Sequence, residues 1–358
     1  MLRDGAFNLD YRVKNFSPVD LRKNTKTEFL SGYILAADIG GTNARFALFE
    51  LVNEELKLFK EKSYKTKEQH SFLKVLKDFC GTDLKNIESV CIGVAGPVSK
   101  GKAQLTNSPW LIDRAQIIKE TNIQQVWILN DMEAHAYALK KLKPSDYYEI
   151  KKGTTSRGNA GLISPGTGLG EAGILWEETH FIPFASEGGH CDFSPRTELD
   201  RALWHYLNKK FGHVSWERII SGPGIYNLYL FLLEYRKIEE PKWFSTKIKN
   251  TDPTLVISKC AKDSKYPVCK ETIDLFIRFL AIESAQLALK FKATKGIYIG
   301  GGILPKNLEL LDNQLFKKNF VDSNKMNPLL EQIPVKVILN DKTALTGAAL
   351  FSMSKLKG

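Results

Sequence analysis

Cysteine is scarce in this sequence, and its spacing does not favour cross-links. The five cysteines occur at irregular intervals and without a Cys-x-x-Cys pair; they are Cys80, Cys91, Cys191, Cys260 and Cys269. An odd number of scattered cysteines indicates neither a disulfide framework nor a zinc site. We therefore expect buried free thiols in a reducing cytoplasm.

Long apolar runs are missing as well. The longest uncharged run covers residues 219–233 and contains both glycine and proline, whereas a membrane-spanning helix needs about 20 apolar residues. Residues 1–31 have no apolar stretch and carry several acidic residues, so we expect an extension that is neither a secretory signal nor a transit peptide. These absences predict a cytoplasmic protein without a membrane segment.

The charge is basic but dispersed. The chain has 51 Lys and Arg against 40 Asp and Glu, a net charge of +11. An Arg-rich arm, a zinc finger and an RNA-binding signature are all lacking, so we expect no nucleic-acid partner and interpret the lysines as a solvated surface. A composition of 43% apolar and 25% charged residues is typical of globular proteins, and 358 residues suit two domains.

Short apolar segments and helical spacings alternate along the chain. Residues 33–39 and 89–94 read as buried strands, and residues 131–142 have helical character. The second half restarts with a strand at 160–164 and is mostly helical over 198–291. Strands mixed with crossover helices indicate an α/β protein.

Three glycine segments are candidates for holding phosphate groups. Glycine backbones let N–H groups approach an anion closely. The first two segments lie between expected strands, so a plain hairpin turn would also explain their glycines. The third follows an expected strand, so a strand-to-helix turn would also explain its glycines. The segments are Asp38-Ile39-Gly40-Gly41-Thr42-Asn43, Gly166-Thr167-Gly168-Leu169-Gly170 and Gly300-Gly301-Gly302.

A carboxylate in the first segment implies a metal ion. Asp38 would repel neighbouring phosphates, and a Mg²⁺ ion between them removes that conflict. We therefore predict that Asp38 binds Mg²⁺ through water.

Two further segments match well-known nucleotide motifs but lack the required context. Residues 96–103 match a P-loop except for Ala103, and the next residues alternate like a strand. Residues 168–173 match G-x-G-x-x-G, but a strand follows instead of a helix. We predict that neither segment binds a nucleotide by those motifs.

In this order, the three glycine segments resemble the two phosphate loops and the adenosine loop of the sugar kinase, actin and Hsp70 superfamily. More specific motifs are similar to the bacterial-type glucokinase family, from about Gly32 to the C-terminus. They are ADIGGTNARFAL (37–48), GVAGPV (93–98), LTNSPW (105–110), ILNDMEAHA (128–136), GTGLGEA (166–172), EGGHCDF (187–193), WERIISGPGIYNLY (216–229), GGGILP (300–305) and NDKTALTGAAL (340–350).

The resemblance implies a two-lobed, actin-like ATPase (ribonuclease H-like) α/β fold with a cleft between its lobes. After an extension at 1–31, residues 32–141 and 341–358 would form a small α/β domain, and residues 142–340 a large α+β domain. It also implies a homodimer with ATP as co-substrate and glucose as substrate. Ala37 and Ser164-Pro165 depart from the family pattern in loop detail. Only Cys191 follows His190, so we predict no zinc.

The resemblance also implies roles for individual residues. Asp131 matches the catalytic base, which accepts the proton of the 6-hydroxyl as its oxygen attacks the γ-phosphorus. The matching sugar-binding residues are Asn130, Asp131, Glu187, His190 and Glu217, and Thr106 and Asn107 match a segment that lines the sugar cleft. The nucleotide-binding residues would be Asp38, Gly40, Gly41, Thr42, Asn43, Gly166, Thr167, Gly168, Gly300, Gly301 and Gly302.

Alternatives exist for single residues and for the whole chain. Taken alone, Asp131 fits a helix N-cap, His190 a structural histidine and Glu187 a surface charge. A sugar-sensing transcription factor on the same fold would need a helix-turn-helix, for which residues 1–31 are too short. A sugar-binding protein without activity would not need Asp131 together with two phosphate loops.

Overall fold

The computed structural model describes residues 32–52, 55–105, 110–154, 156–178, 180–263 and 266–357. They belong to one compact unit, Gly32–Gly358. The extension at 1–31 and the predicted sugar-cleft residues Thr106 and Asn107 lie outside the described residues. No described helix is long and apolar enough to cross a membrane.

The first sheet is built from the apolar segments of the N-terminal part. Strand β2 pairs antiparallel with both β3 and β1, whereas β1, β4 and β8 run parallel. The spatial order is β3 (Glu55–Lys65), β2 (Asn43–Val52), β1 (Tyr33–Ile39), β4 (Ile87–Val94) and β8 (Gln125–Asn130). The first glycine segment forms the hairpin between β1 and β2.

The second sheet repeats this arrangement and adds one strand at its edge. Its order is β12 (His180–Ser186), β11 (Leu169–Glu177), β10 (Ala160–Pro165), β13 (Gly296–Ile299), β14 (Val335–Ile338) and β9 (Tyr147–Lys151). Strands β12, β11 and β10 are antiparallel, and β10, β13 and β14 are parallel. Three antiparallel strands followed by two parallel ones thus occur twice, and the second glycine segment again forms the first hairpin.

Helices and a small third sheet complete the described residues. The third sheet consists of β5 (Val98–Ser99), β6 (Lys102–Gln104) and β7 (Leu111–Asp113). The α-helices are α1 (Phe72–Cys80), α2 (Arg114–Thr121), α3 (Asp131–Ala138), α4 (Glu198–Phe211), α5 (Gly222–Arg236), α6 (Lys242–Asn250), α7 (Pro253–Lys262), α8 (Pro267–Phe291), α9 (Asn313–Val321), α10 (Asn327–Gln332) and α11 (Thr343–Leu356). Short 3₁₀ helices are η1 (Thr66–Glu68), η2 (Gly81–Asn86), η3 (Pro144–Asp146), η4 (Gly188–His190), η5 (Trp216–Arg218), η6 (Leu308–Leu310) and η7 (Asn324–Met326).

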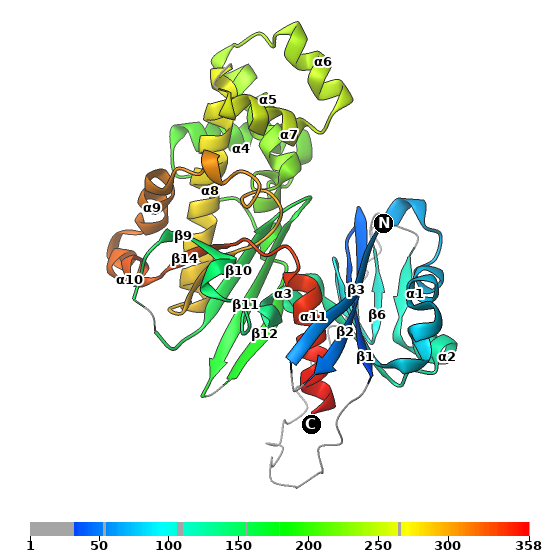
Figure 1. The fold of residues 1–358 in the computed structure, drawn as a ribbon. Coiled ribbons are helices and arrows are strands. Elements are labelled where there is room, and N and C mark those ends of the chain that lie inside the picture. Colours follow the sequence, from blue (N-terminus) through cyan, green and yellow to red (C-terminus); the bar gives the residue numbers. More distant parts are fainter. Residues whose placement is uncertain are drawn as a thin grey trace, which may run out of the picture. The chain divides into compact units, whose positions relative to one another are not determined.

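Helix α3 connects the two sheets. It packs against β4 and β8 of the first sheet, against β11 of the second, and along the C-terminal helix α11 (Figure 1). The approach to α11 is close, because a Cβ at Gly347 would lie 1.7 Å from the carbonyl oxygen of Ala134. The first residue of α3 is therefore placed where elements of both sheets meet.

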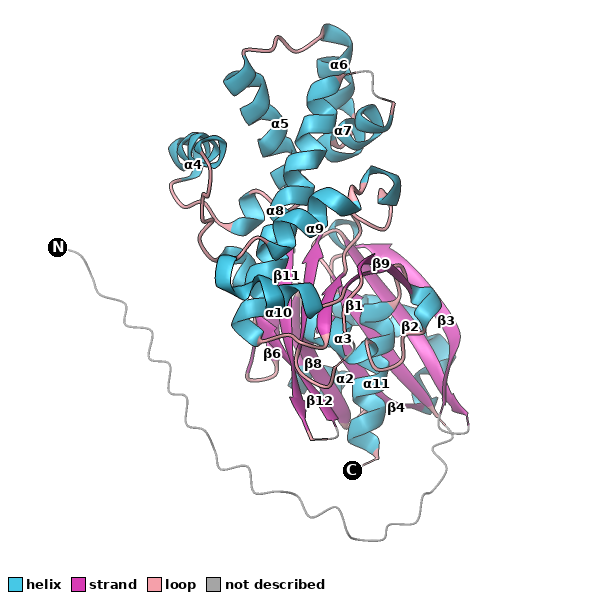
Figure 2. Ribbon diagram, turned by 90° about the vertical axis from the view of Figure 1, so that its left-hand side faces the viewer, coloured by secondary structure: helices cyan, strands magenta, loops and turns pink. Residues whose placement is uncertain are grey.

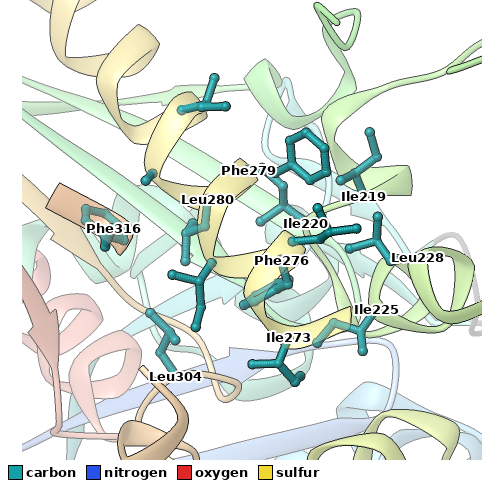
Figure 3. Packing of buried hydrophobic residues seen from close by; sticks show 14 of the residues in the cluster. Ile219, Ile220, Ile225, Leu228, Ile273, Phe276, Phe279, Leu280, Leu304 and Phe316 are labelled. Atoms are coloured by element: carbon teal, nitrogen blue, oxygen red, sulfur yellow. The ribbon is translucent and has the colours of Figure 1, made fainter. Parts of the chain in front are cut away.

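The largest core lies around the long helix α8 (Figure 2). Phe276 and Phe279 of α8 face Ile219, Ile220 and the labelled residues of α5 (Figure 3). Burying side chains of this size stabilises the fold by about 1.5–3 kcal/mol each. This core fixes the start of α5 and the η5 turn just before it.

The element predictions largely agree with the structure. Residues 131–138, rather than 131–142, form α3. The P-loop match continues into strand β6 and the G-x-G-x-x-G match into β11, which confirms that neither has the required helix. One prediction was wrong: Cys191 is exposed, because it follows the η4 turn at the surface, whereas the other four free thiols are buried.

Candidate active site

The first glycine hairpin is closed by its own backbone. The N–H of Gly40 donates to the carbonyl of Asn43 at 2.9 Å. The η1 turn supports it from outside, since Thr66 donates its N–H to the carbonyl of Thr42 at 3.0 Å and its hydroxyl to that of Gly40 at 2.9 Å. The hairpin is therefore held in a defined position by contacts on its outer side.

The second glycine hairpin is shorter and rests on a helix start. The N–H of Gly166 donates to the carbonyl of Gly168, and the carbonyl of Gly166 accepts from the N–H of Gly222, both at 2.8 Å. Gly222 is the first residue of α5. The large core beneath α5 therefore determines where this hairpin lies.

A pocket of about 670 Å³ joins all three glycine segments. Of the predicted nucleotide-binding residues it is lined by Asp38, Gly40, Gly41, Thr42, Asn43, Thr167, Gly300, Gly301 and Gly302. Gly301 has a φ of +78°, and a Cβ there would lie 2.1 Å from the carbonyl of Pro165. The third segment therefore needs glycine to pass so close to the second hairpin.

Backbone donors in this pocket are available for a ligand. Among the described residues, no protein acceptor pairs with the N–H groups of Gly41, Thr42 and Thr167, which line the pocket. Backbone N–H groups require a partner when a site closes, and anions are suitable partners. The hairpins are thus turns and potential phosphate cradles at once.

Asp38 forms an ion pair on the pocket wall. Its Oδ2 accepts from Nη2 and Nε of Arg45 at 2.9 and 3.3 Å, while Nη1 of Arg45 donates to the carbonyl of Asp341 at 2.8 Å. Asp38 and Arg45 are direct partners in the β1–β2 register. Oδ1 has no hydrogen-bond partner among the described residues, and Asp38 lines the pocket.

The donor set of the pocket fits a loosely held Mg²⁺ ion. A carboxylate oxygen suits Mg²⁺, which keeps several waters and binds through one or two carboxylates plus phosphates. No group of three or more His, Cys, Asp or Glu side chains that could hold a metal occurs in the described part of the chain. The carboxylates that line the pocket are Asp38 and Asp341, and any ion there would depend on phosphate oxygens and water.

Asn130 and Asp131 stand at the junction of β8 and α3. Asn130 is the N-cap, since its Oδ1 accepts from the N–H of Met132 at 2.9 Å, and its Nδ2 donates to the carbonyl of Gly96 at 3.3 Å. Asp131 is the first helical residue, and its Oδ1 also accepts from Met132. The alternative that Asp131 is a plain N-cap is therefore wrong; Asn130 takes that position.

The environment of Asp131 favours its neutral form. Burial, followed by the charges of Asp38 and Glu187, raises the pKa of Asp131 to about 7, against the lowering effect of the Met132 N–H. A carboxylate with a pKa near neutrality has the property that general-base catalysis requires. The same interactions place Asp131 near both the nucleotide pocket and the Glu187 segment.

Glu187 and His190 lie on the short η4 turn. Both side chains are exposed, and the turn is closed by the N–H of His190 donating to the carbonyl of Glu187 at 3.0 Å. The carbonyl of Cys191 accepts from the N–H of Trp216 at 3.0 Å, so this segment is joined to η5. The two segments with predicted sugar-binding residues therefore meet.

Glu217 points from η5 to the second hairpin. Its Oε2 accepts from the N–H of Leu169 at 2.9 Å, and a Cβ at Gly168 would lie 2.5 Å from the same oxygen. Gly168 thus leaves room for the carboxylate. Asp131, Glu187, His190 and Glu217 surround the start of β11, although no direct bond links Asp131 to Glu217 among the described contacts.

Several pocket residues had no assigned role from sequence. They are Arg45, Ser63, His135, Pro305, Lys306, Thr343 and residues 338–341. Burial lowers the pKa of His135, whose Nδ1 lies 2.8 Å from the Thr343 hydroxyl. Arg45 and His135 occur within the quoted motifs, but a motif does not tell which of its side chains turn toward a ligand.

The fold and site define a class of protein with known structures. The chain superposes on the crystal structure of a glucokinase from an Antarctic psychrotroph with a TM-score of 0.78 and 31% identity, covering 90% of this chain and 99% of that one. A ROK family glucokinase from Streptomyces griseus, solved with glucose and AMPPNP, has the same fold at 20% identity and a TM-score of 0.61, over 89% and 98% of the chains. The predicted two-domain, actin-like sugar-kinase fold is confirmed.

Sequence comparison narrows the class to one family. The family model described as Glucokinase matches residues 35–355. A glucokinase from Trichormus variabilis is 35% identical over 334 residues, which cover 88% of this chain and 98% of that protein. The chain belongs to the glucokinase family.

Proposed function

We propose that the chain phosphorylates the 6-hydroxyl of glucose with Asp131 as the general base. The activity, ATP-dependent phosphorylation of glucose, is that of the glucokinase family. The observation that carries the residue assignment is the position of Asp131, buried at a helix start and close enough to Asp38 and Glu187 for both to raise its pKa. It thus lies between the proposed nucleotide pocket and the proposed sugar-binding segment.

In the proposed reaction the chain's own groups bind, orient and move one proton. Asp131 accepts the hydroxyl proton as the sugar oxygen bonds to the γ-phosphorus and the bond to the β-phosphate oxygen breaks, releasing ADP. Unpaired N–H groups of Gly41, Thr42 and Thr167 would hold the phosphates, and Lys306 lines the same pocket. Because the transition state is loose, positioning and charge neutralisation carry most of the rate.

Asp38 is the proposed metal-binding residue. Mg²⁺ bound there through water would neutralise phosphate charge, and Arg45 would hold the Asp38 carboxylate toward it. Asn130, Glu187, His190 and Glu217 would bind the sugar hydroxyls in pairs, as carboxylates and amides can. Thr106 and Asn107 remain predicted cleft residues.

A coupled assay tests the function directly. ADP release should require glucose, ATP and Mg²⁺ or Mn²⁺ together, and should stop in excess EDTA. Release at the same rate without the sugar would contradict the kinase assignment. Mannose in place of glucose measures how strictly the sugar is selected.

Three further predictions from the sequence remain part of the proposal. They are the division into 32–141 with 341–358 and 142–340, a cytoplasmic location and a homodimer. Sedimentation of the purified chain tests the dimer, for which a single species of about twice the 40.4 kDa chain mass is expected.

A further inference from the structure

Two buried carboxyl groups lie behind the proposed sugar site. Glu171 of β11 and Glu283 of α8 have exposed fractions of 1% and 0%. Oε1 of Glu171 and Oε2 of Glu283 have no hydrogen-bond partner among the described residues. The other oxygen of Glu283 accepts from Nζ of Lys290 at 3.2 Å. Buried carboxyl groups with so few partners are costly, so their presence needs a reason.

Glu171 touches the segment that carries Glu187 and His190. A Cβ at Gly188 would lie 2.0 Å from Oε2 of Glu171, so only glycine allows the backbone to rest on this carboxyl group. Ser186, the direct partner of Glu171 in the β11–β12 register, accepts from the N–H of Gly188 at 3.0 Å. The η4 turn is therefore supported by Glu171 and Ser186 together.

The fold itself does not require an acid at this position. In the first sheet, the matching residue is Phe46, two positions beyond the closing pair of the hairpin and opposite Ala37, as Glu171 is opposite Ile163. Phe46 is fully buried in an aromatic cluster. An apolar side chain thus suits this strand, and the carboxyl group of Glu171 points to a role beyond packing.

We propose that Glu171 is a positioning residue of the sugar site: its buried carboxyl group supports Gly188, which sets the position of Glu187 and His190. This inference rests on the proposed function, because it assumes that Glu187 and His190 bind the sugar. Glu171 itself touches neither substrate nor nucleotide. Its influence would pass through the backbone of η4.

The surrounding charges make the support sensitive to pH. Burial raises the pKa of Glu171 to about 7, with Lys290 lowering it. Burial and then the charge of Glu171 raise the pKa of Glu283 to about 8, against Lys290 and Arg196. Both carboxyl groups therefore keep their protons to higher pH than an exposed carboxyl group does. When the pH rises far enough for both protons to leave to water, two buried negative charges repel each other under η4.

The test uses two changes at Glu171 in the full-length chain. Glu171→Asp shortens the side chain and withdraws the carboxyl group from Gly188. We expect the glucose Kd and KM to rise about tenfold at pH 7, less than the hundredfold that a 1 Å misplacement can cost, with the KM for ATP within about twofold of the parent. Glu171→Gln keeps the shape without a titrating group, so glucose binding at pH 7 should stay near the parent value while its weakening between pH 7 and 9 disappears.

Controls separate positioning from general stability. Glu177→Asp changes the exposed end of the same strand and should alter neither constant. Glu283→Gln should remove the alkaline weakening as Glu171→Gln does. If Glu171→Asp fails to fold, the pH dependence of glucose binding by Glu171→Gln still tests the proposal. Glucose binding that still weakens between pH 7 and 9 in Glu171→Gln would overturn it.

Calorimetric titration with glucose tests the positioning role of Glu171 separately from the proposed kinase reaction. An unchanged glucose Kd in Glu171→Asp, or an equal loss of ATP affinity, would overturn the positioning role. A parent protein that binds glucose but releases no ADP would instead contradict only the proposed reaction. A parent protein that binds no glucose would contradict both.

Discussion

At the base of the first glycine hairpin, Asp38 and Arg45 face each other as an ion pair. The second hairpin has Ser164 and Gly170 at the matching positions of the β10–β11 register. The strand pattern is the same, but one hairpin carries charge and the other carries small residues.

The small residues of the second hairpin leave space for other segments. A Cβ at Gly170 would lie 2.5 Å from Sδ of Met132, and Gly168 makes room for Glu217. Under the proposed assignment the first hairpin would hold the metal as well as phosphate, whereas the second also brings side chains of other segments close together. The comparison shows that two copies of one strand arrangement can serve different purposes when a few residues at matching positions differ.

Asp131 lies where the two regions meet, and substituting it should reduce the catalytic rate more than any other change considered. Asp131→Asn keeps the shape but removes the base, so kcat should fall by about 10²–10⁴ with glucose still bound. Initial rates of ADP release measure this, with Glu133→Gln on the same helix as the control. Activity within a few-fold of the parent would refute the assignment.

Removing the carboxylate at the base of the first hairpin should weaken the use of MgATP without changing the affinity for glucose. Asp38→Ala should lower kcat/KM for MgATP by about 10–100-fold, the usual effect of losing a group that holds a metal through water. The glucose Kd should stay unchanged. Asp78→Ala, at an exposed position of α1 outside the pocket, serves as the control. A parallel loss of glucose binding would contradict the division between the hairpins.

A change at Glu217, which contacts the second hairpin, should weaken the use of glucose without changing the affinity for ATP. Glu217→Gln keeps an oxygen for the N–H of Leu169 but loses the charge that strengthens bonds to sugar hydroxyls. Hydrogen bonds to charged groups contribute about 1.5–3 kcal/mol, so kcat/KM for glucose should fall by about ten- to a hundredfold. ATP affinity by titration should not change, and Glu198→Gln is a surface control. Were ATP affinity alone disturbed, Glu217 would not belong to the sugar site.

The smallest expected effect is a shift of the pH profile. Because burial and two neighbouring charges raise the pKa of Asp131 to about 7, kcat/KM for glucose should rise with pH through that value as the base loses its proton. Glu187→Gln removes one of those charges, lowers the pKa, and should move the acid limb to lower pH by a fraction of a unit. A limb that stays in place would show that Glu187 does not act on Asp131.

Much of the fold follows from local sequence, because short apolar runs ending in glycine specify strands and hairpins. The helix start at Asn130 and Asp131 is local too, although the sequence did not tell which of the two caps it. Sheet order and register depend on long-range pairing, and only the fold brings Glu217 against Gly168. Whether these residues act as proposed remains a prediction.

Glu171 illustrates what local pattern cannot predict. In the sequence it is the acidic first residue of the strand-like segment 171–176, and nothing local indicates that it is buried. In the fold Glu171 is buried, and α8, which follows it by about a hundred residues, packs on the neighbouring strand β10 of the same sheet. For the same reason the pocket residues Arg45, His135 and Lys306 had no assigned role, since the direction of a side chain depends on its neighbours in space.

The start of β11 has a consequence for redesigning the sugar preference of this enzyme. Within four consecutive positions, residues 168–171, the strand contacts Glu217, Met132 and Gly188. Substitutions among groups that share such a support are not independent, and their free energies of interaction are typically 0.5–3 kcal/mol. Libraries that vary η4, η5 or α3 one at a time would therefore miss productive combinations, and β11 should be varied together with them.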